Sequence, residues 1–261
     1  MQGFLLVNPS SGEGESDELA DAARARGLTV HVLREGDDPA ALAEKADADA
    51  IGVAGGDGSL APVAAVAARR GLAFVCIPAG TRNHFARDLG LDRDDPVGAL
   101  AAFDGGRERR IDLAFAGERP FLNNVSLGLY ASLVHRRERH RRRRDALARL
   151  RALAALTTHR SVPLRVDGRP VDVDVLLVAN NAYDLDLLTL GERERLDEGL
   201  LHVYGVGGLL PSLRWEEHGG SFTVDGARAL PAAVDGEPDV LEAPVRFRLE
   251  PGALRVLVPG D

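Results

Sequence analysis

The chain has 261 residues, of which 45% are hydrophobic and 28% charged, and its formal net charge is −8. This length can bury one large core or two modest ones, and the composition excludes a disordered chain. The acidic balance, with a pI near 5.4, argues against a general nucleic-acid-binding protein.

The start of the chain, residues 1–9, has no basic region and too short an apolar run for a signal peptide. The longest uncharged stretches, such as residues 199–213, fall short of the roughly 20 residues that a bilayer span needs. The expected location is therefore cytoplasmic, with any membrane contact peripheral and at the inner face.

The single cysteine, Cys76, lies in an apolar run at residues 74–77. No His or Arg stands beside it to lower its pKa, so we expect a buried strand thiol and not a nucleophile.

The first half of the chain alternates apolar runs with helical patterns. Strands are expected at residues 4–7, 29–33, 51–54, 74–77 and 109–115, and helices at residues 16–26, from 39 onward, 60–70 and 96–103. Gly27 should end the first helix, while Asp38 and Asp95 are N-cap candidates, each followed by a proline. Short βαβ units of this kind predict an α/β domain with a parallel sheet covered on both faces, which binds ligands at the carboxyl ends of its strands.

The second half of the chain has a different pattern. Short β-type runs separated by Gly, Pro and Asp turns favour an antiparallel β-sandwich. They cover residues 162–166, 171–179, 200–206, 221–224, 232–234, 245–249 and 254–258, and one helical segment at 135–156 interrupts them. The composition changes near Asp112, which predicts a nucleotide-binding domain at 1–112 and a substrate domain at 113–249.

A glycine-rich turn, Gly55-Gly56-Asp57-Gly58-Ser59, follows the third expected strand and opens a helix. Glycines let the backbone approach phosphate oxygens, and helix N-terminal amides supply positive potential. Asp57 adds a carboxylate that can hold Mg²⁺. Pro62 is expected in the first turn of the helix, where its missing N–H costs little. A plain strand-to-helix turn is the alternative, and the chain has no Walker A pattern.

Four segments in a fixed order make the pattern specific. They are residues 8–12 (NPSSG), 55–60 (GGDGSL), 78–90 (PAGTRNHFARDLG) and 234–237 (VDGE). Together they resemble the diacylglycerol kinase catalytic family, which includes bacterial lipid kinases and sphingosine kinases. The resemblance implies a Rossmann-like nucleotide domain and a C-terminal β-sandwich, with the last strands near 250–261 returning to the first domain.

The resemblance also implies roles for individual residues. The general base for the lipid hydroxyl would be Glu237, in the motif that begins at Asp235, and Asp112 matches an acidic residue of the family's Mg²⁺–water network. ATP contacts would come from Asn8, Ser10, Gly55, Gly56, Asp57, Gly58, Ser59, Thr81 and Asn83. Asp57 is the metal candidate at the phosphates, while Asp197 and Glu198 match a segment that holds a structural Mg²⁺ in some members, although Arg193 and Arg195 could instead make these two a solvated turn. Asn123 and Asn124 are either cleft residues or buried amides.

The sequence departs from the family pattern at three places. Ala61 and Pro62 stand where the family has Asn and Glu, and His84 stands where it has an acidic residue. The first hypothesis is an ATP- and Mg²⁺-dependent kinase acting on a hydroxyl of diacylglycerol or a related lipid alcohol. The departures favour a second, a catalytically silent nucleotide- or lipid-binding protein. The third is an NAD kinase, which shares the glycine turn.

An arginine-rich segment covers Arg136 to Arg151 and runs into leucines at helical spacing. It is either a solvated helix or a contact with anionic lipid headgroups, to which each basic residue near the surface adds on the order of 1 kcal/mol. Nucleic acid is not the expected partner, and the sequence predicts no oligomeric state.

Overall fold

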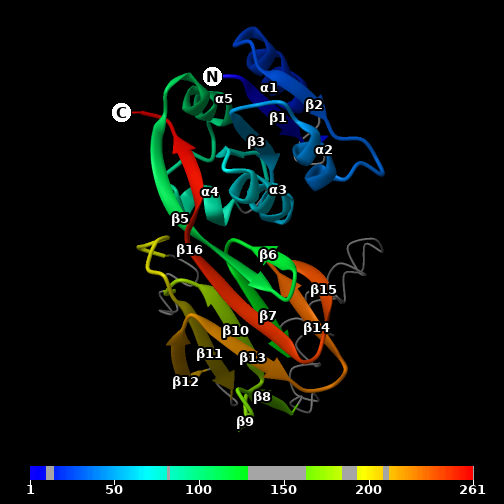
Figure 1. Cartoon of the computed structure of the whole chain (residues 1–261), viewed down its shortest axis with the longest axis vertical. Helices are drawn as coiled ribbons and strands as arrows, with labels where there is room; N and C mark the ends of the chain where they lie inside the picture. Colours follow the sequence, from blue (N-terminus) through cyan, green and yellow to red (C-terminus); the bar gives the residue numbers. More distant parts are fainter. Residues whose placement is uncertain (10–14, 81–82, 129–162, 184–192, 208–211, 261) are drawn as a thin grey trace, which may run out of the picture. The chain divides into compact units, whose positions relative to one another are not determined.

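The computed structural model describes residues 1–9, 15–80, 83–128, 163–183, 193–207 and 212–260 (Figure 1). The chain divides into two compact units. Unit 1 contains Met1–Leu113, Tyr183–Gly199 and Glu250–Asp261, and unit 2 contains Ala114–Ala182 and Leu200–Leu249.

Unit 1 has the expected α/β alternation. Its parallel strands are β1 (Gly3–Val7), β2 (Thr29–Val32), β3 (Ala50–Gly55) and β4 (Ala73–Pro78), in the sheet order β2-β1-β3-β4. Its helices are α1 (Glu15–Ala25), α2 (Pro39–Lys45), α3 (Asp57–Arg70), α4 (His84–Asp88), α5 (Pro96–Ala99) and the 3-10 helix η2 (Leu100–Asp104). Every residue of β3 and β4 is buried, as a sheet covered on both faces requires. The predicted α/β class is confirmed.

Local sequence explains where two of these helices begin and end. Asp38 is the N-cap of α2 and accepts hydrogen bonds from the amides of Ala40 and Ala41, as expected. Helix α3 begins at Asp57, earlier than the expected start at residue 60, because Gly56 is its N-cap, and Gly71 ends it in the left-handed conformation. Pro62 therefore lies in the second turn and not the first, and the helix continues through it to Arg70.

Unit 2 is a two-layer sandwich of short strands. One layer is a six-stranded antiparallel sheet in the order β12-β11-β10-β7-β14-β15. The other contains β13, β8, β9 and β6 with parts of β5 and β16. The bounds are β5 (Arg107–Ala116), β6 (Arg119–Phe121), β7 (Asn124–Gly128), β8 (Leu164–Val166), β9 (Arg169–Val171), β10 (Val175–Asn180), β11 (Leu201–Gly207), β12 (Ser212–Gly219), β13 (Ser221–Asp225), β14 (Ala229–Val234), β15 (Glu237–Glu242) and β16 (Val245–Val258).

Each unit has its own hydrophobic core. In unit 2, Val125 and Val203 of the six-stranded sheet share a cluster with Phe222 and Phe247 of the other layer. In unit 1, Leu5 and Val75 of the parallel sheet share a cluster with Leu100 and neighbouring residues. Burial on both faces of a strand or between two layers is what the apolar runs in the sequence predicted.

Strand β16 joins the two units along the chain. Its residues 245–248 pair antiparallel with β13, and residues 255–257 pair parallel with β4. The sequence predicted two separate strands at 245–249 and 254–258, because Pro251 and Gly252 lie between them. The prediction of a break was wrong: Pro251 falls between the two paired stretches, so its missing N–H disrupts neither ladder.

The segment Tyr183–Gly199 belongs to unit 1, although the sequence analysis assigned it to the second domain. Its contacts explain the difference: the Asp112 amide donates to the Leu196 carbonyl at 2.8 Å, and Arg193 pairs with Asp88. The helical prediction at 135–156 lies outside the described residues. Within the described part of the chain, none of the helices has the length and apolar character to cross a membrane.

Candidate active site

Two glycine turns meet at the carboxyl ends of β3 and β4. Gly56 follows β3 and Gly80 lies two residues beyond the end of β4. A Cβ atom on Gly80 would lie 2.5 Å from the Cα of Gly56 and 3.0 Å from its backbone nitrogen. The two turns are therefore packed backbone against backbone, and glycine at position 80 is a steric requirement.

The first amides of α3 are available to a ligand. Neither the Asp57 nor the Gly58 backbone N–H makes a hydrogen bond within the described residues, and the N-cap Gly56 has no side chain to satisfy them. Such amides and the positive end of a helix favour a phosphate group. The turn therefore fits the phosphates of a nucleotide.

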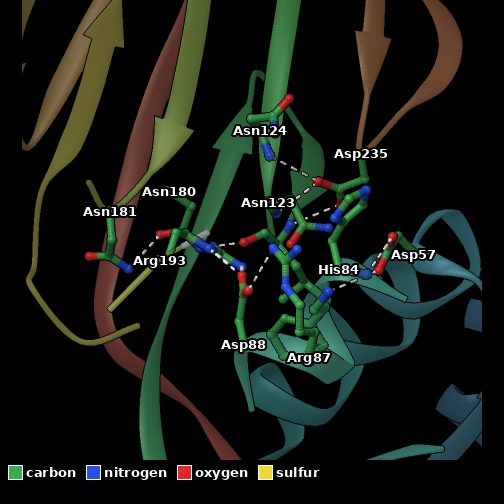
Figure 2. Close-up of polar contacts among 12 residues, drawn as sticks. Asp57, His84, Arg87, Asp88, Asn123, Asn124, Asn180, Asn181, Arg193 and Asp235 are labelled. Atoms are coloured by element: carbon green, nitrogen blue, oxygen red, sulfur yellow. Dashed lines mark hydrogen bonds and ion pairs between the residues drawn. The ribbon is translucent and has the colours of Figure 1, made fainter. Parts of the chain in front are cut away.

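The carboxylate of Asp57 is engaged by the start of α4. It accepts hydrogen bonds from the amides of His84 and Phe85, both at 3.2 Å (Figure 2). Asp57 is 7% exposed, so these donors replace most of its hydration. It connects the two glycine turns through α4.

Asn83 closes the second turn. Its backbone is left-handed, with φ of 49°, and its side-chain oxygen and nitrogen bond the N–H and C=O of Gly80 at 2.8 and 2.7 Å. The buried side chain therefore shapes the loop next to the Gly56 turn, and the cofactor contact that the resemblance implied for it stays a prediction.

Asn8 and Ser59 lie together beside the same turn. The Asn8 amide nitrogen donates to the Ser59 hydroxyl at 3.1 Å, and both side chains approach Gly55. A residue that follows β1 and one in the first turn of α3 are thus brought together at this turn, and their contact with a nucleotide stays a prediction. Ser10 and Thr81, also predicted to contact ATP, lie outside the described residues.

Asp112 is buried in β5 and holds two turns. Its carboxylate accepts hydrogen bonds from the amides of Gly199 at 2.6 Å and Gly252 at 2.8 Å. Because both oxygens accept backbone donors and the residue is 1% exposed, the observed contacts are structural. The catalytic role implied by the resemblance stays a prediction.

The acidic residues predicted to bind metal are not gathered into one group. Asp197 is exposed and pairs with Arg195 at 3.1 Å, which is the solvated-turn alternative. Among the described residues, no group of three or more His, Cys, Asp and Glu side chains could hold a metal ion. A Mg²⁺ ion held by one or two carboxylates together with phosphate or water oxygens is a different kind of site, so the metal roles of Asp57, Asp197 and Glu198 stay predictions.

In unit 2, Asp235 and Gly236 form a tight hairpin between β14 and β15. Their φ angles are 48° and 82°, as a type I′ turn requires, and Val234 pairs with Glu237. The Asp235 carboxylate accepts hydrogen bonds from the amides of Leu122, Asn123 and Asn124 at 2.8–3.1 Å (Figure 2). Asp235 thus fixes the hairpin to the start of β7, which is a positioning role.

Glu237 is the first residue of β15, and its side chain is exposed. Its position is set by the hairpin turn and by the Asp235 contacts. An exposed carboxylate next to a rigid turn can accept a proton from a bound hydroxyl.

Of the two asparagines that the sequence left open, Asn123 is buried and Asn124 is half-buried. Asn123 is 3% exposed, and its carbonyl accepts from the Asn180 amide. The Asn180 side chain donates to the Leu122 carbonyl at 3.1 Å and accepts from Asn181 at 3.3 Å. These contacts brace the segment that Asp235 also holds.

The buried-thiol prediction for Cys76 is confirmed, and burial raises the pKa of this thiol.

Sequence reasoning missed Gly80 and Asp88 as individual site residues. Gly80 stood inside a quoted motif, so its signal was present, but only the packing against Gly56 shows why it matters. Asp88 pairs with Arg193, 105 residues away in the sequence, and no local pattern indicates that contact.

The fold and the site define an α/β protein with a glycine turn that opens a helix, followed by a β-sandwich. The family model of the diacylglycerol kinase catalytic domain matches residues 2–116 of this chain. A diacylglycerol kinase of Mycobacterium tuberculosis strain H37Rv is 32% identical over 221 residues, which cover 76% of this chain and 71% of the relative. The chain therefore belongs to the diacylglycerol kinase family.

Two further proteins are similar. An uncharacterized protein of Synechocystis is 25% identical over 156 residues, covering 52% of this chain and 36% of that protein. The crystal structure of a diacylglycerol kinase from Bacillus anthracis superposes with a TM-score of 0.73 at 20% identity, covering 98% of this chain and 96% of that one. The latter likeness confirms the fold class.

Proposed function

We propose that the chain is an ATP-dependent lipid kinase that transfers the γ-phosphoryl group to a hydroxyl of diacylglycerol or a related lipid alcohol. The observation that carries the proposal is the start of α3, where the Asp57 and Gly58 amides lie beside the paired turns of Gly56 and Gly80. Phosphoryl transfer depends mainly on positioning and charge stabilisation, which such amides supply. The M. tuberculosis relative, a diacylglycerol kinase, supports the lipid acceptor.

Glu237 is the proposed general base. The chain's other acidic candidates, Asp57, Asp112 and Asp235, each accept backbone hydrogen bonds, whereas Glu237 is exposed at a rigid turn. A base must reach the acceptor hydroxyl, and an exposed carboxylate is the group suited to that. Mg²⁺ is assigned to the phosphates of the nucleotide, where it usually binds in such enzymes.

The direct test is an ADP-release assay with ATP and a panel of lipid alcohols, with NAD as a separate acceptor. Turnover with a lipid alcohol supports the proposal, and turnover with NAD alone replaces it with an NAD kinase. ATP binding without turnover on any acceptor favours the catalytically silent protein, which the engagement of three acidic side chains by backbone amides also favours.

The base is tested with Glu237→Gln, which keeps size and polarity. We expect ATP affinity to stay unchanged and kcat to fall by about 10²–10⁴-fold, the usual effect of losing a general base. Glu242→Gln is the matched control, because Glu242 is exposed at the other end of β15. Equal kcat in the two variants would show that Glu237 is only a turn residue.

Membrane attachment through Arg136 to Arg151 is the remaining proposal. These residues lie outside the described part of the chain. Binding to anionic vesicles that weakens with added salt would support it.

A further inference from the structure

Helix α4 has only five residues, His84–Asp88, and cannot be stable in isolation. Its N-terminal end is held by Asp57, whose carboxylate accepts hydrogen bonds from the backbone amides of His84 and Phe85. Its last residue, Asp88, carries a negative charge at the negative end of the helix, which is unfavourable without a cation. The position of α4 must therefore depend on what neutralises Asp88.

Asp88 is neutralised by a buried arginine. The Arg193 Nε and terminal nitrogen lie 2.8 and 2.7 Å from one Asp88 carboxylate oxygen, and the two side chains are 0% and 2% exposed (Figure 2). Arg87 approaches the second oxygen at 3.3 Å. The guanidinium carbon of Arg193 also lies 5.3 Å from the ring centre of Tyr183. Because so little water reaches this pair, removal of Asp88 would leave a buried arginine without this carboxylate, and removal of Arg193 would leave Asp88 with the longer contact to the more exposed Arg87.

We propose that Arg193 and Asp88 are a positioning pair for the phosphate turns. This inference rests on the proposed function. The pair fixes the far end of α4, α4 presents its first two amides to Asp57, and Asp57 is the first residue of α3. Arg193 comes from the Tyr183–Gly199 segment between β10 and β11, so this excursion of the chain into unit 1 controls the geometry of the glycine turns.

The test uses the protein without nucleotide first. Amide hydrogen exchange at His84 and Phe85 is measured by NMR in the parent protein and in Arg193→Met. We expect exchange at these two amides to be faster by about tenfold or more, because their contact with Asp57 opens more often. Asp88→Asn should have the same effect, and Arg193→Lys, which keeps the charge but not the planar two-nitrogen contact, should be intermediate.

A matched control separates positioning from general destabilisation. Arg255 in β16 bonds Glu108 at 2.8 Å and the Gly71 carbonyl at 2.9 Å, so it braces unit 1 at the opposite end of α3. Arg255→Met should lower stability without selective acceleration at His84 and Phe85. The proposal would be overturned if amide exchange in Arg193→Met became faster evenly over the whole of unit 1. It would also be overturned if exchange became faster only at residues 193–199.

Nucleotide affinity gives the second readout. We expect Arg193→Met to weaken ATP binding about tenfold in the folded protein, and the double variant with Asp88→Asn to recover part of the loss, since it removes the carboxylate that has lost Arg193. If the parent protein binds no ATP, the proposed function fails, while the exchange experiment still decides whether the pair positions α4. If Arg193→Met does not fold, Asp88→Asn and Arg193→Lys carry the same comparison.

Discussion

At the scale of single residues, the shape of the candidate site depends on glycines and on acidic side chains that contact the backbone. Gly56 and Gly80 let two turns approach closely, and Asp57, Asp112 and Asp235 each accept two or three backbone amides. A carboxylate suits this use because it offers two acceptor oxygens to donors from different segments. These three carboxylates therefore hold the loops of the candidate site in place.

The two glycines should differ in their tolerance of alanine. A Cβ on Gly80 would lie 2.5 Å from Gly56 Cα and 2.8 Å from the Asn83 side-chain oxygen, whereas the contact nearest a Cβ on Gly56 is 3.8 Å away. We expect Gly80→Ala to lower the free energy of unfolding by about 1–3 kcal/mol, as overpacking does. Gly56→Ala should keep the stability and lose ATP affinity, because its methyl group meets the phosphate.

Urea unfolding and ATP titration of both variants check this prediction. Equal stabilities would contradict the close packing of the two turns. Normal ATP affinity in Gly56→Ala would contradict the phosphate assignment.

At the scale of elements, the β14–β15 hairpin is defined by its turn and by one side chain. The type I′ turn at Asp235 and Gly236 suits the twist of two antiparallel strands. The Asp235 carboxylate then ties this turn to the connection between β6 and β7. The hairpin that carries Glu237 is thus held by hydrogen bonds to residues 122–124, which lie more than 100 positions earlier in the chain.

Replacement of Asp235 by Asn should loosen this element. The amide group has one acceptor oxygen in place of two, and its NH₂ would face a backbone N–H. We expect a loss of about 1–3 kcal/mol in the free energy of unfolding, the usual cost of leaving a buried donor unsatisfied. Urea unfolding measures it, with Glu237→Gln as the exposed neighbour that should cost almost nothing. A stable Asp235→Asn variant would mean that the three hydrogen bonds contribute little.

At the scale of the whole molecule, ion pairs, one of them between segments far apart in the chain, give the protein a pH dependence. The hydrogen bond from Arg255 lowers the pKa of Glu108 below its usual value of 4.5, and the hydrogen bond with His31 lowers the pKa of Asp37 below 3.8. A carboxyl group whose pKa is lower in the folded state stabilises the protein above its unfolded-state pKa. That contribution is lost as the pH falls through the folded-state pKa.

The Glu108→Gln variant tests this dependence. We expect it to be less stable than the parent protein at pH 6, with a smaller difference at pH 3, because the contribution of the Glu108 charge is lost as the pH falls toward and through its lowered folded-state pKa. Urea midpoints at the two pH values provide the measurement. A difference that stays constant between pH 6 and pH 3 would contradict the role of the Glu108 charge.

The sequence by itself determined the alternation of strands and helices, the strand-to-helix glycine turn and the N-cap at Asp38. These features depend on residues close together in the chain, where periodicity and turn chemistry act directly. The motif pattern also indicated the family, which the comparison with relatives confirmed.

Only the tertiary structure decided which partner each buried polar group has. Asp88 and Arg193 are 105 residues apart, and Asp235 bonds amides more than 110 residues away. Pro251 predicted a break that β16 does not have, because its position relative to two neighbouring strands decides whether a missing N–H matters. Local sequence patterns carry no information on such contacts. The partner of a buried charge or amide comes within hydrogen-bond distance only when the chain has folded.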